Sequence, residues 1–201
     1  MKNGNYTTKN TSQALILAGG NSSRMSYPKA WLKYNDNISF LEHIVNTLEQ
    51  VKINNIVVVL NKNSFNGFEK KINALSNKCL IIKNNKPELG RLHSIKLAYP
   101  YFSKTNLLIN NIDNPSVSVS TIRELIKYNI NDESYLVPSY NNKNGHPIIL
   151  SYKILQKVQD SENSLTLRDI LHEENKVIIN VEDENILHNI NTKTDYEKLY
   201  M

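Results

Sequence analysis

A short segment near the N-terminus gathers residue types that bind phosphate groups. Gly19 and Gly20 directly follow the apolar run 15–18, and glycines let backbone N–H groups approach a phosphate chain closely. Hydroxyl, guanidinium and ammonium donors for phosphate oxygens follow, in the side chains of Ser22, Ser23, Arg24 and Lys29. The segment is neither a Walker A loop nor a Gly-x-Gly-x-x-Gly dinucleotide turn. We predict a nucleotide-phosphate loop of another kind, with a surface loop of incidental charge as the alternative.

A single carboxylate, Asp113, follows the apolar run 106–109, and Pro115 redirects the chain two residues later. Mg²⁺ commonly takes one or two protein carboxylates and fills its other positions with phosphates and water. Ligands of open α/β sheets bind at the carboxyl ends of strands. We therefore predict that Asp113 binds Mg²⁺; an aspartate that only caps a turn is the alternative.

Two further motifs are weaker by themselves. Gly90 precedes a helical segment and Ser94 follows one turn later, so the helix could bind an anion or present its hydroxyl to a base. The same string also fits the start of an ordinary amphipathic helix. His146 lies between Gly145 and Pro147, and the remaining histidines have no spacing that predicts a zinc site.

The elements that must position these residues alternate between strand-length apolar runs and segments of helical period, which predicts an α/β fold with helices on both faces of a mostly parallel sheet. The predicted strands are Ala14–Ala18, Ile56–Leu60, Leu80–Lys83, Asn106–Ile109, Tyr135–Val137, Ile148–Leu150 and Val177–Val181. The first predicted helix begins at a capping box, Ser39 with Glu42, and runs to Val51. Further helices are predicted at Ser64–Asn77, Leu89–Tyr99, Val119–Tyr128, Thr166–Glu173 and Thr192–Leu199. A tight turn is predicted at Asn144-Gly145.

The composition limits the classes of function. The net charge of +5 is spread among many asparagines rather than gathered in a basic stripe, so nucleic acid is not the expected partner. No apolar run reaches about 18 residues and the first residues are polar, so we expect a cytoplasmic protein without a membrane anchor. The single cysteine, Cys79, excludes an intramolecular disulfide. The 201 residues fit one domain, predicted at 13–201 after a flexible tail at 1–12.

Together these motifs resemble the molybdenum-cofactor guanylyl- and cytidylyltransferases, the MobA-like NTP transferases. The family's Leu-Ala-Gly/Ala-Gly-x-Ser-x-Arg-Met segment matches Leu17, Ala18 and the residues that follow through Met25, with Lys29 in place. The other matches occur in the family's order: Asn84, Gly90 and Ser94 in the base-binding stretch, Asp113-Asn114-Pro115 as the metal-binding motif, Gly145-His146-Pro147 before the strand facing the acceptor, and 189–196 near the end. The resemblance implies a Rossmann-like nucleotidyltransferase fold and catalytic roles for Arg24, Lys29 and Asp113.

The resemblance also implies that an NMP group passes from an NTP, with Mg²⁺, to a phosphorylated acceptor, such as a molybdenum pterin cofactor that is then delivered to a molybdoenzyme. The donor is left open between CTP and GTP, with CTP favoured. Asn189 and Asn191 replace two carboxylates of the family's terminal motif, and an amide oxygen can bind Mg²⁺ but adds no negative charge. The alternatives are a sugar- or polyol-phosphate nucleotidyltransferase and a nucleotide-binding relative with impaired turnover.

Overall fold

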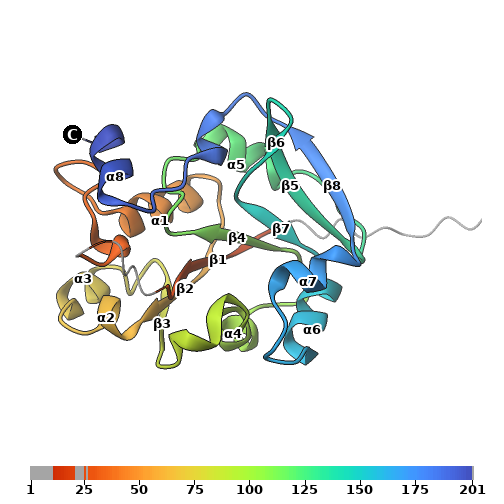
Figure 1. Ribbon diagram of the computed structural model, residues 1–201, viewed down its shortest axis with the longest axis horizontal. Coiled ribbons are helices and arrows are strands. Elements are labelled where there is room, and N and C mark those ends of the chain that lie inside the picture. Colours follow the sequence, from red (N-terminus) through yellow and green to blue (C-terminus); the bar gives the residue numbers. More distant parts are fainter. Residues whose placement is uncertain (1–10, 21–24, 26, 201) are drawn as a thin grey trace, which may run out of the picture.

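The computed structural model describes residues 11–20, 25 and 27–200 (Figure 1). Ser22, Ser23 and Arg24 of the predicted phosphate loop, and most of the predicted tail, lie outside the described residues. Among the helices of the described part, none is long and apolar enough to cross a membrane.

The first half of the sheet is wholly parallel. The central strand β1 (Gln13–Ala18) lies between β2 (Asn55–Asn61) and β4 (Leu107–Asn111), and β3 (Leu80–Asn84) pairs with the outer edge of β2. Every residue of β1 and β4 is buried, because helices cover both faces of this part of the sheet.

The second half of the sheet is mixed. The strand β7 (Ile148–Leu150) runs antiparallel to both β4 and β5 (Ser134–Tyr140), so β5 points in the same direction as β4. The strand β8 (Asn175–Asn180) pairs with β5 in parallel, and the short β6 (Lys143–Asn144) pairs with it in antiparallel. All described strands except β6 and β7 therefore share one direction, which confirms the predicted mostly parallel sheet.

One face of the sheet is covered by α1 (Phe40–Gln50), α5 (Val119–Leu125) and α8 (Lys193–Tyr200). The predicted capping box is confirmed: the backbone N–H of Ser39 donates to Glu42 Oε2 at 2.7 Å, and Ser39 Oγ accepts from the Glu42 N–H. The core on this face includes Trp31 and Phe40, both fully buried.

The other face is covered by α4 (Gly90–Ala98), α6 (Tyr152–Asp160) and α7 (Leu167–His172), which lie together in Figure 1. Their core side chains pack on the opposite side of the same strands, so the predicted three-layer arrangement is confirmed. The described part of the chain also has short 3₁₀ helices at η1 (Lys29–Trp31), η2 (Pro87–Leu89), η3 (Tyr99–Tyr101) and η4 (Glu184–Leu187).

Two predictions about elements are corrected, and one helix was missed. The helix predicted at Ser64–Asn77 is two short helices, α2 (Lys62–Phe65) and α3 (Glu69–Ala74), because Gly67 between them has φ of +81°, outside the helical region. The helix α6 was not predicted, although Ser151 caps it and Ile154, Leu155 and Val158 are buried at helical spacing.

The predicted tight turn at Asn144-Gly145 is also wrong. The chain reverses at Asn141 and Asn142, which have φ of +47° and +61° and connect the paired residues Tyr140 and Lys143. Asparagine tolerates this left-handed conformation, so a pair of asparagines can form the two-residue turn. Gly145 is required for a different reason: a Cβ there would lie 2.4 Å from the carbonyl oxygen of Ile186.

Candidate active site

The predicted phosphate loop and Asp113 meet at one edge of the sheet. The strands β1 and β4 are parallel neighbours, with Leu17 opposite Asn111 in register, and the Ile112 N–H donates to the Leu17 carbonyl at 3.0 Å. The chain leaving β1 continues into Gly19, and the chain leaving β4 continues into Asp113. The connection from β1 leads to β2 on one side, whereas β4 lies on the other, so this edge is the point where the strand order reverses.

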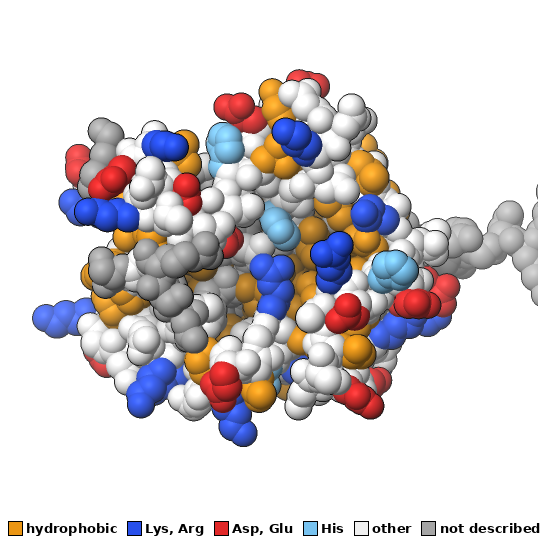
Figure 2. Space-filling view, in the orientation of Figure 1, with side chains coloured by type: hydrophobic (Ala, Val, Ile, Leu, Met, Phe, Trp, Pro, Cys, Tyr) orange, Lys and Arg blue, Asp and Glu red, His pale blue; other side chains and the backbone are white. Residues whose placement is uncertain are grey.

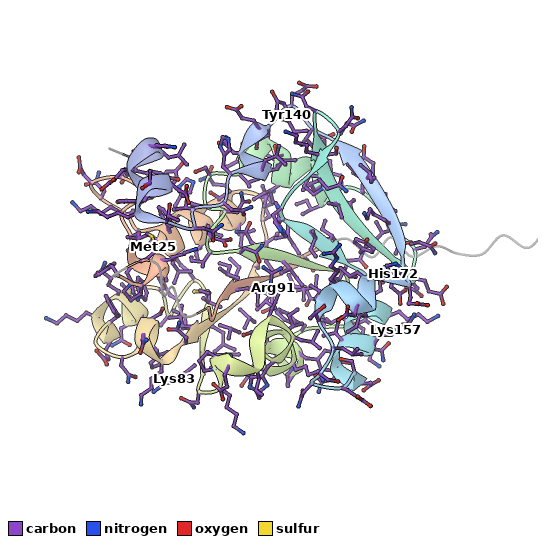
Figure 3. The ribbon with its side chains drawn as sticks, in the orientation of Figure 1. Met25, Lys83, Arg91, Tyr140, Lys157 and His172 are labelled. Atoms are coloured by element: carbon purple, nitrogen blue, oxygen red, sulfur yellow. The ribbon has the colours of Figure 1, made fainter. Side chains whose placement is uncertain are left out.

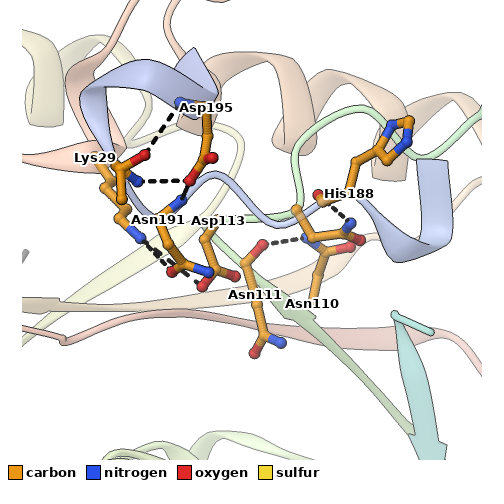
Figure 4. A network of polar contacts seen from close by, with 9 residues as sticks. Lys29, Asn110, Asn111, Asp113, His188, Asn191 and Asp195 are labelled. Atoms are coloured by element: carbon orange, nitrogen blue, oxygen red, sulfur yellow. Dashed lines mark hydrogen bonds and ion pairs between the residues drawn. The ribbon is translucent and has the colours of Figure 1, made fainter. Parts of the chain in front are cut away.

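Lys29 reaches this edge from η1, which is fixed by its third residue. The fully buried Trp31 donates from Nε1 to the carbonyl of Ser64 at 2.7 Å. The Lys29 ammonium donates to Asn191 Oδ1 at 3.0 Å and lies 3.9 Å from Asp113 Oδ2 (Figure 4). A buried cation therefore lies against two of the three predicted metal-binding residues, Asp113 and Asn191, although they lie far apart in sequence.

Asp113 is positioned by backbone contacts. Its carbonyl accepts from the Ile190 N–H at 2.7 Å, which brings the segment 189–191 against the end of β4. Asn114, fully buried, donates from Nδ2 to the carbonyls of Asn185 and His188, both at 2.8 Å. These bonds leave the Asp113 side chain available, and its Oδ1 is buried without a hydrogen-bond partner among the described residues.

The turn that carries Asn191 is fixed by Asp195. Its carboxylate accepts the backbone N–H groups of Asn191 at 2.9 Å and Thr192 at 2.8 Å, and Thr192 Oγ1 accepts the N–H of Asp195 in return. The hydrogen bond from the Asn191 backbone, followed by those from Thr192, lowers the pKa of Asp195 below its usual range. Asp195 therefore positions Asn191 rather than joining the cluster itself.

The two asparagines of the terminal motif are not equivalent. Asn191 contacts Lys29, whereas the Asn189 side chain is exposed and makes no hydrogen bond to this cluster within the described part of the chain. No group of three or more His, Cys, Asp and Glu side chains is placed to bind a metal among those residues. Asp113, whose Oδ1 is buried without a partner among the described residues, is the carboxylate at this edge that could hold a metal, and one carboxylate fits Mg²⁺ bound mainly by substrate phosphates.

Two of the predicted base-binding residues, Asn84 and Ser94, lie next to Gly19. The side chain of Asn84, at the end of β3, donates to Ser94 Oγ on α4 at 3.1 Å, and both residues are buried. Gly19 lies against both side chains, because a Cβ on Gly19 would lie 2.9 Å from Ser94 Oγ and 3.7 Å from Asn84 Nδ2. Asn61, which sequence reasoning missed, donates from Nδ2 to the Gly20 carbonyl at 2.5 Å and fixes the loop from β2.

Gly90 has a different role from its predicted neighbours. It has φ of +78° at the junction of η2 and α4, a conformation that favours glycine, and a Cβ there would meet nothing within 4 Å. It therefore sets the start of α4, the helix that carries Ser94 one turn further on.

His146 lies close enough to Asp113 for the carboxylate to influence its pKa. Its backbone N–H donates to the Ile186 carbonyl at 2.9 Å, the His146–Pro147 peptide bond is cis, and Nδ1 is buried without a partner among the described residues. Burial lowers the pKa of His146, and the positive charge of Arg91 lowers it further, while the negative charge of Asp113 raises it. Arg91, to which the sequence assigned no role, thus lies close enough to His146 for its charge to act there, and it is labelled near the centre of the view in Figure 3.

Space-filling Figure 2 shows a hollow near the centre of this face, with hydrophobic side chains on its floor and Lys, Arg and His side chains at its rim. An edge with a glycine loop, a buried lysine and a carboxylate, next to a cationic hollow, is suited to bringing two anionic substrates together.

The chain belongs to the MobA-like NTP transferase domain family, whose model matches residues 14–177. It is 28% identical over 203 residues to a probable molybdenum cofactor guanylyltransferase from Clostridium perfringens, covering 92% of this chain and 94% of that protein. It is 24% identical over 182 residues to the molybdenum cofactor cytidylyltransferase of Escherichia coli, covering 90% and 92%. A solved nucleotidyl transferase from Methanothermobacter has the same fold, with a TM-score of 0.75 at 17% identity, covering 93% of this chain and 94% of that one. The fold is thus the Rossmann-like α/β fold of nucleotidyltransferases.

Proposed function

We propose that this protein transfers an NMP group from a nucleoside triphosphate to a phosphorylated acceptor and releases pyrophosphate. The observation that carries the proposal is the cluster of Lys29, Asp113 and Asn191 at the carboxyl ends of β1 and β4, directly beyond Gly19 and Gly20. A loop that only bound a nucleotide would not require a buried lysine beside an unpartnered carboxylate oxygen.

In the proposed reaction, an oxygen of the acceptor phosphate attacks the α-phosphorus, and the bond from that phosphorus to the pyrophosphate oxygen breaks. The acceptor phosphate is already an anion, so no general base is needed, and catalysis consists of positioning and charge neutralisation. The Lys29 ammonium donates to phosphate oxygens that gain negative charge, and Arg24 adds a second cation from the same loop. The Gly19–Gly20 backbone lets the triphosphate approach over Ser94, while the hydroxyls of Ser22 and Ser23 add donors.

Mg²⁺, where bound by Asp113 Oδ1 and the triphosphate, would offset charge on the phosphates. Asn191 would act through Lys29, since its Oδ1 already accepts from that ammonium. Asn189, which is exposed, would reach a metal only as an additional neutral ligand.

For the donor we favour CTP over GTP, and for the acceptor a molybdenum pterin cofactor, with a molybdoenzyme as recipient of the product. Relatives named as molybdenum cofactor guanylyl- and cytidylyltransferases support a molybdenum cofactor as acceptor and do not decide between the two bases. The Asp113-Asn114-Pro115 motif followed by Val117, together with Gly145-His146-Pro147, resembles the cytidylyl members more closely.

The proposal is tested with two assays on the same preparation. Thermal unfolding with Mg²⁺ and each of CTP, GTP, ATP and UTP identifies the donor, and we expect the largest rise in melting temperature with CTP. Pyrophosphate release is then measured with that donor and a panel of molybdopterin, sugar phosphates and polyol phosphates. Turnover with molybdopterin is expected, and turnover with a sugar or polyol phosphate instead would replace the proposed acceptor.

A second candidate, a nucleotide-binding relative with impaired turnover, is favoured by one observation: Lys29 pairs with the neutral Asn191 where the family has a carboxylate. Stabilisation by one triphosphate without pyrophosphate release from any acceptor would select this candidate.

A further inference from the structure

Asn111, the last residue of β4, has no role in the reaction proposed above, yet its side chain carries an unpaired polar atom. The residue is 4% exposed, and its buried Oδ1 accepts no hydrogen bond from the described part of the chain. A buried carbonyl oxygen without a donor costs folding free energy, because the group has lost its hydrogen bonds to water. Such an atom next to a reaction edge indicates a ligand that supplies the missing donor.

The neighbouring Asn110 is buried to a similar degree, at 1% exposed, but has a structural role. Its Nδ2 donates to the Asn111 carbonyl at 3.0 Å. Successive residues of a strand face opposite sides of the sheet. Leu108 belongs to the core under α1 and α5, whereas Ile109 belongs to the core under α4 and α6. Asn110 therefore faces the α1 side of the sheet, and Asn111 faces the α4 side.

The Asn111 side chain lies on the same face of the sheet as the contact between Gly19 and Ser94. Leu17 is opposite Asn111 in register, and its side chain belongs to the core under α4. Gly19 follows Leu17 by two residues and lies against Ser94 of α4. In Figure 4 the Asn111 amide points away from the Lys29 ammonium. Asn111 is thus available on the α4 face, beside the donor loop.

This position fits the sugar of the donor nucleotide, since a ribose joins the base to the α-phosphate. The predicted base-binding residues Asn84 and Ser94 lie on the β3 side of Gly19. Asp113 follows Asn111 by two residues, at most about 7 Å along the chain. A nucleotide with its base beside Asn84 and its α-phosphate at Asp113 would therefore have its ribose over the adjacent ends of β1 and β4, where Asn111 lies.

The groups around Asn111 favour an uncharged ligand. The antiparallel register that pairs Ile109 with Ile148, continued by two residues, brings Asn111 beside His146. His146 Nδ1 is also buried without a partner among the described residues. Burial lowers the pKa of His146, so its imidazole is neutral at neutral pH. Neutral polar groups suit a hydroxyl group, whereas the Lys29 ammonium suits a phosphate.

We propose that Asn111 determines the sugar specificity of the donor: its Oδ1 accepts a hydrogen bond from a ribose hydroxyl group, and the site thereby selects a ribonucleotide over a deoxyribonucleotide. The inference rests on the proposed function, because it assigns a specificity residue to the donor of that reaction. A deoxyribonucleotide would leave Oδ1 buried and unpaired. A site that binds a substrate hydroxyl discriminates strongly against the analogue that lacks it, for this reason.

The test measures binding of CTP, 2′-deoxy-CTP and 3′-deoxy-CTP with Mg²⁺ by isothermal titration calorimetry; if another base gives the largest thermal stabilisation, its three triphosphates are used. We expect the parent protein to bind one deoxy analogue at least about tenfold more weakly than the ribonucleotide. Asn111→Leu keeps a similar volume without the amide, so its three affinities should agree within about twofold. Equal affinities in the parent, or unchanged discrimination in Asn111→Leu, would overturn the proposal.

Asn110→Leu is the matched control. It loses the hydrogen bond to the Asn111 carbonyl, so it should melt at a lower temperature than the parent and keep the parent's preference among the three triphosphates. Asn111→Leu should melt at the parent's temperature or above, because it removes an unpaired buried oxygen. A lower melting temperature for Asn111→Leu than for Asn110→Leu would make Asn111 a structural residue and overturn the proposal.

The outcome for Asn111 is separate from that of the proposed function, because the binding measurements need neither an acceptor nor turnover. Discrimination against a deoxy analogue that depends on Asn111, without pyrophosphate release from any acceptor, would support the sugar-specificity role and contradict the transferase. Pyrophosphate release at equal rates from the ribonucleotide and both deoxy analogues would support the transferase and overturn the role of Asn111.

Discussion

The two halves of the sheet position their side chains in different ways. In the half formed by β1–β4, all strands are parallel, and the residues that we propose to face the triphosphate lie at strand ends or within two residues of them: Gly19, Gly20, Asn84 and Asp113. In the half formed by β5–β8, an antiparallel hairpin and close backbone approaches position His146 and the segment 189–191. The residues that we propose for the donor are thus positioned by strand order, whereas those of the other half are positioned by tertiary contacts that one added side-chain atom can disturb.

Lys29→Ala should have the largest effect, since Lys29 is the described cation that joins both halves. Removal of one preorganised donor costs on the order of 10²–10³-fold in turnover, roughly 3–4 kcal/mol. Pyrophosphate release measures it, with the exposed Lys33→Ala as control. Turnover near that of Lys33→Ala would remove Lys29 from the mechanism.

Gly145→Ala should disturb the half of the sheet formed by β5–β8 more than the half formed by β1–β4. The added Cβ would lie 2.4 Å from the Ile186 carbonyl oxygen, so the backbone of η4 must shift, and overpacking of this kind costs about 1–3 kcal/mol of unfolding free energy. Chemical denaturation measures the loss, with the exposed neighbour Asn144→Ala as control. Stabilisation by CTP should persist in the folded fraction; equal stability of the two variants would contradict the crowding.

Gly19→Ala should affect the donor half alone. Its Cβ would lie 2.9 Å from Ser94 Oγ, so Ser94 must move and weaken its bond with Asn84. One hydrogen bond is worth about 1 kcal/mol, so triphosphate affinity should fall by roughly 5- to 10-fold. Isothermal titration calorimetry compares it with Gly20→Ala, whose Cβ would meet nothing within 4 Å and which should lose less. A larger loss of triphosphate affinity in Gly20→Ala than in Gly19→Ala would contradict the importance of the close approach between Gly19 and Ser94.

Asn191→Asp should add a negative charge where the two halves of the sheet meet. The new carboxylate would stand 3.0 Å from the Lys29 ammonium and beside Asp113, so Mg²⁺ should bind more tightly, by about tenfold or less. Titration of Mg²⁺ in the presence of a non-hydrolysable CTP analogue measures the change. Asn189→Asp, at an exposed position, should gain less, and the reverse order would make Asn189 the metal-facing residue.

How far the sequence predicts the site differs between these two halves. Asp113 and the Gly19–Gly20 pair could be located from sequence, because each follows an apolar run and the carboxyl ends of parallel strands share one edge. Asn61 and Arg91 could not, since no spacing in the sequence encodes the hydrogen bond from Asn61 to Gly20 or the effect of the Arg91 charge on the pKa of His146.

The hairpin illustrates the same limit. Asn144-Gly145 has the composition of a tight turn, but the turn is formed by Asn141 and Asn142. Glycine at position 145 instead leaves room for the carbonyl of Ile186. The local sequence shows which dipeptides are able to form a turn. Which of two suitable dipeptides does so depends on the register of β5 with β6.

The central claim, that Asp113 binds the metal of a nucleotidyl transfer, is tested most directly by Asp113→Asn. The substitution keeps the side-chain shape and the backbone carbonyl that accepts from Ile190, so the fold should remain intact by thermal unfolding. We expect Mg²⁺-dependent pyrophosphate release to fall by on the order of 10²-fold or more, as for loss of another charge-stabilising group. The exposed Asp36→Asn should retain it. An Asp113→Asn protein as active as the parent at every Mg²⁺ concentration would contradict the account.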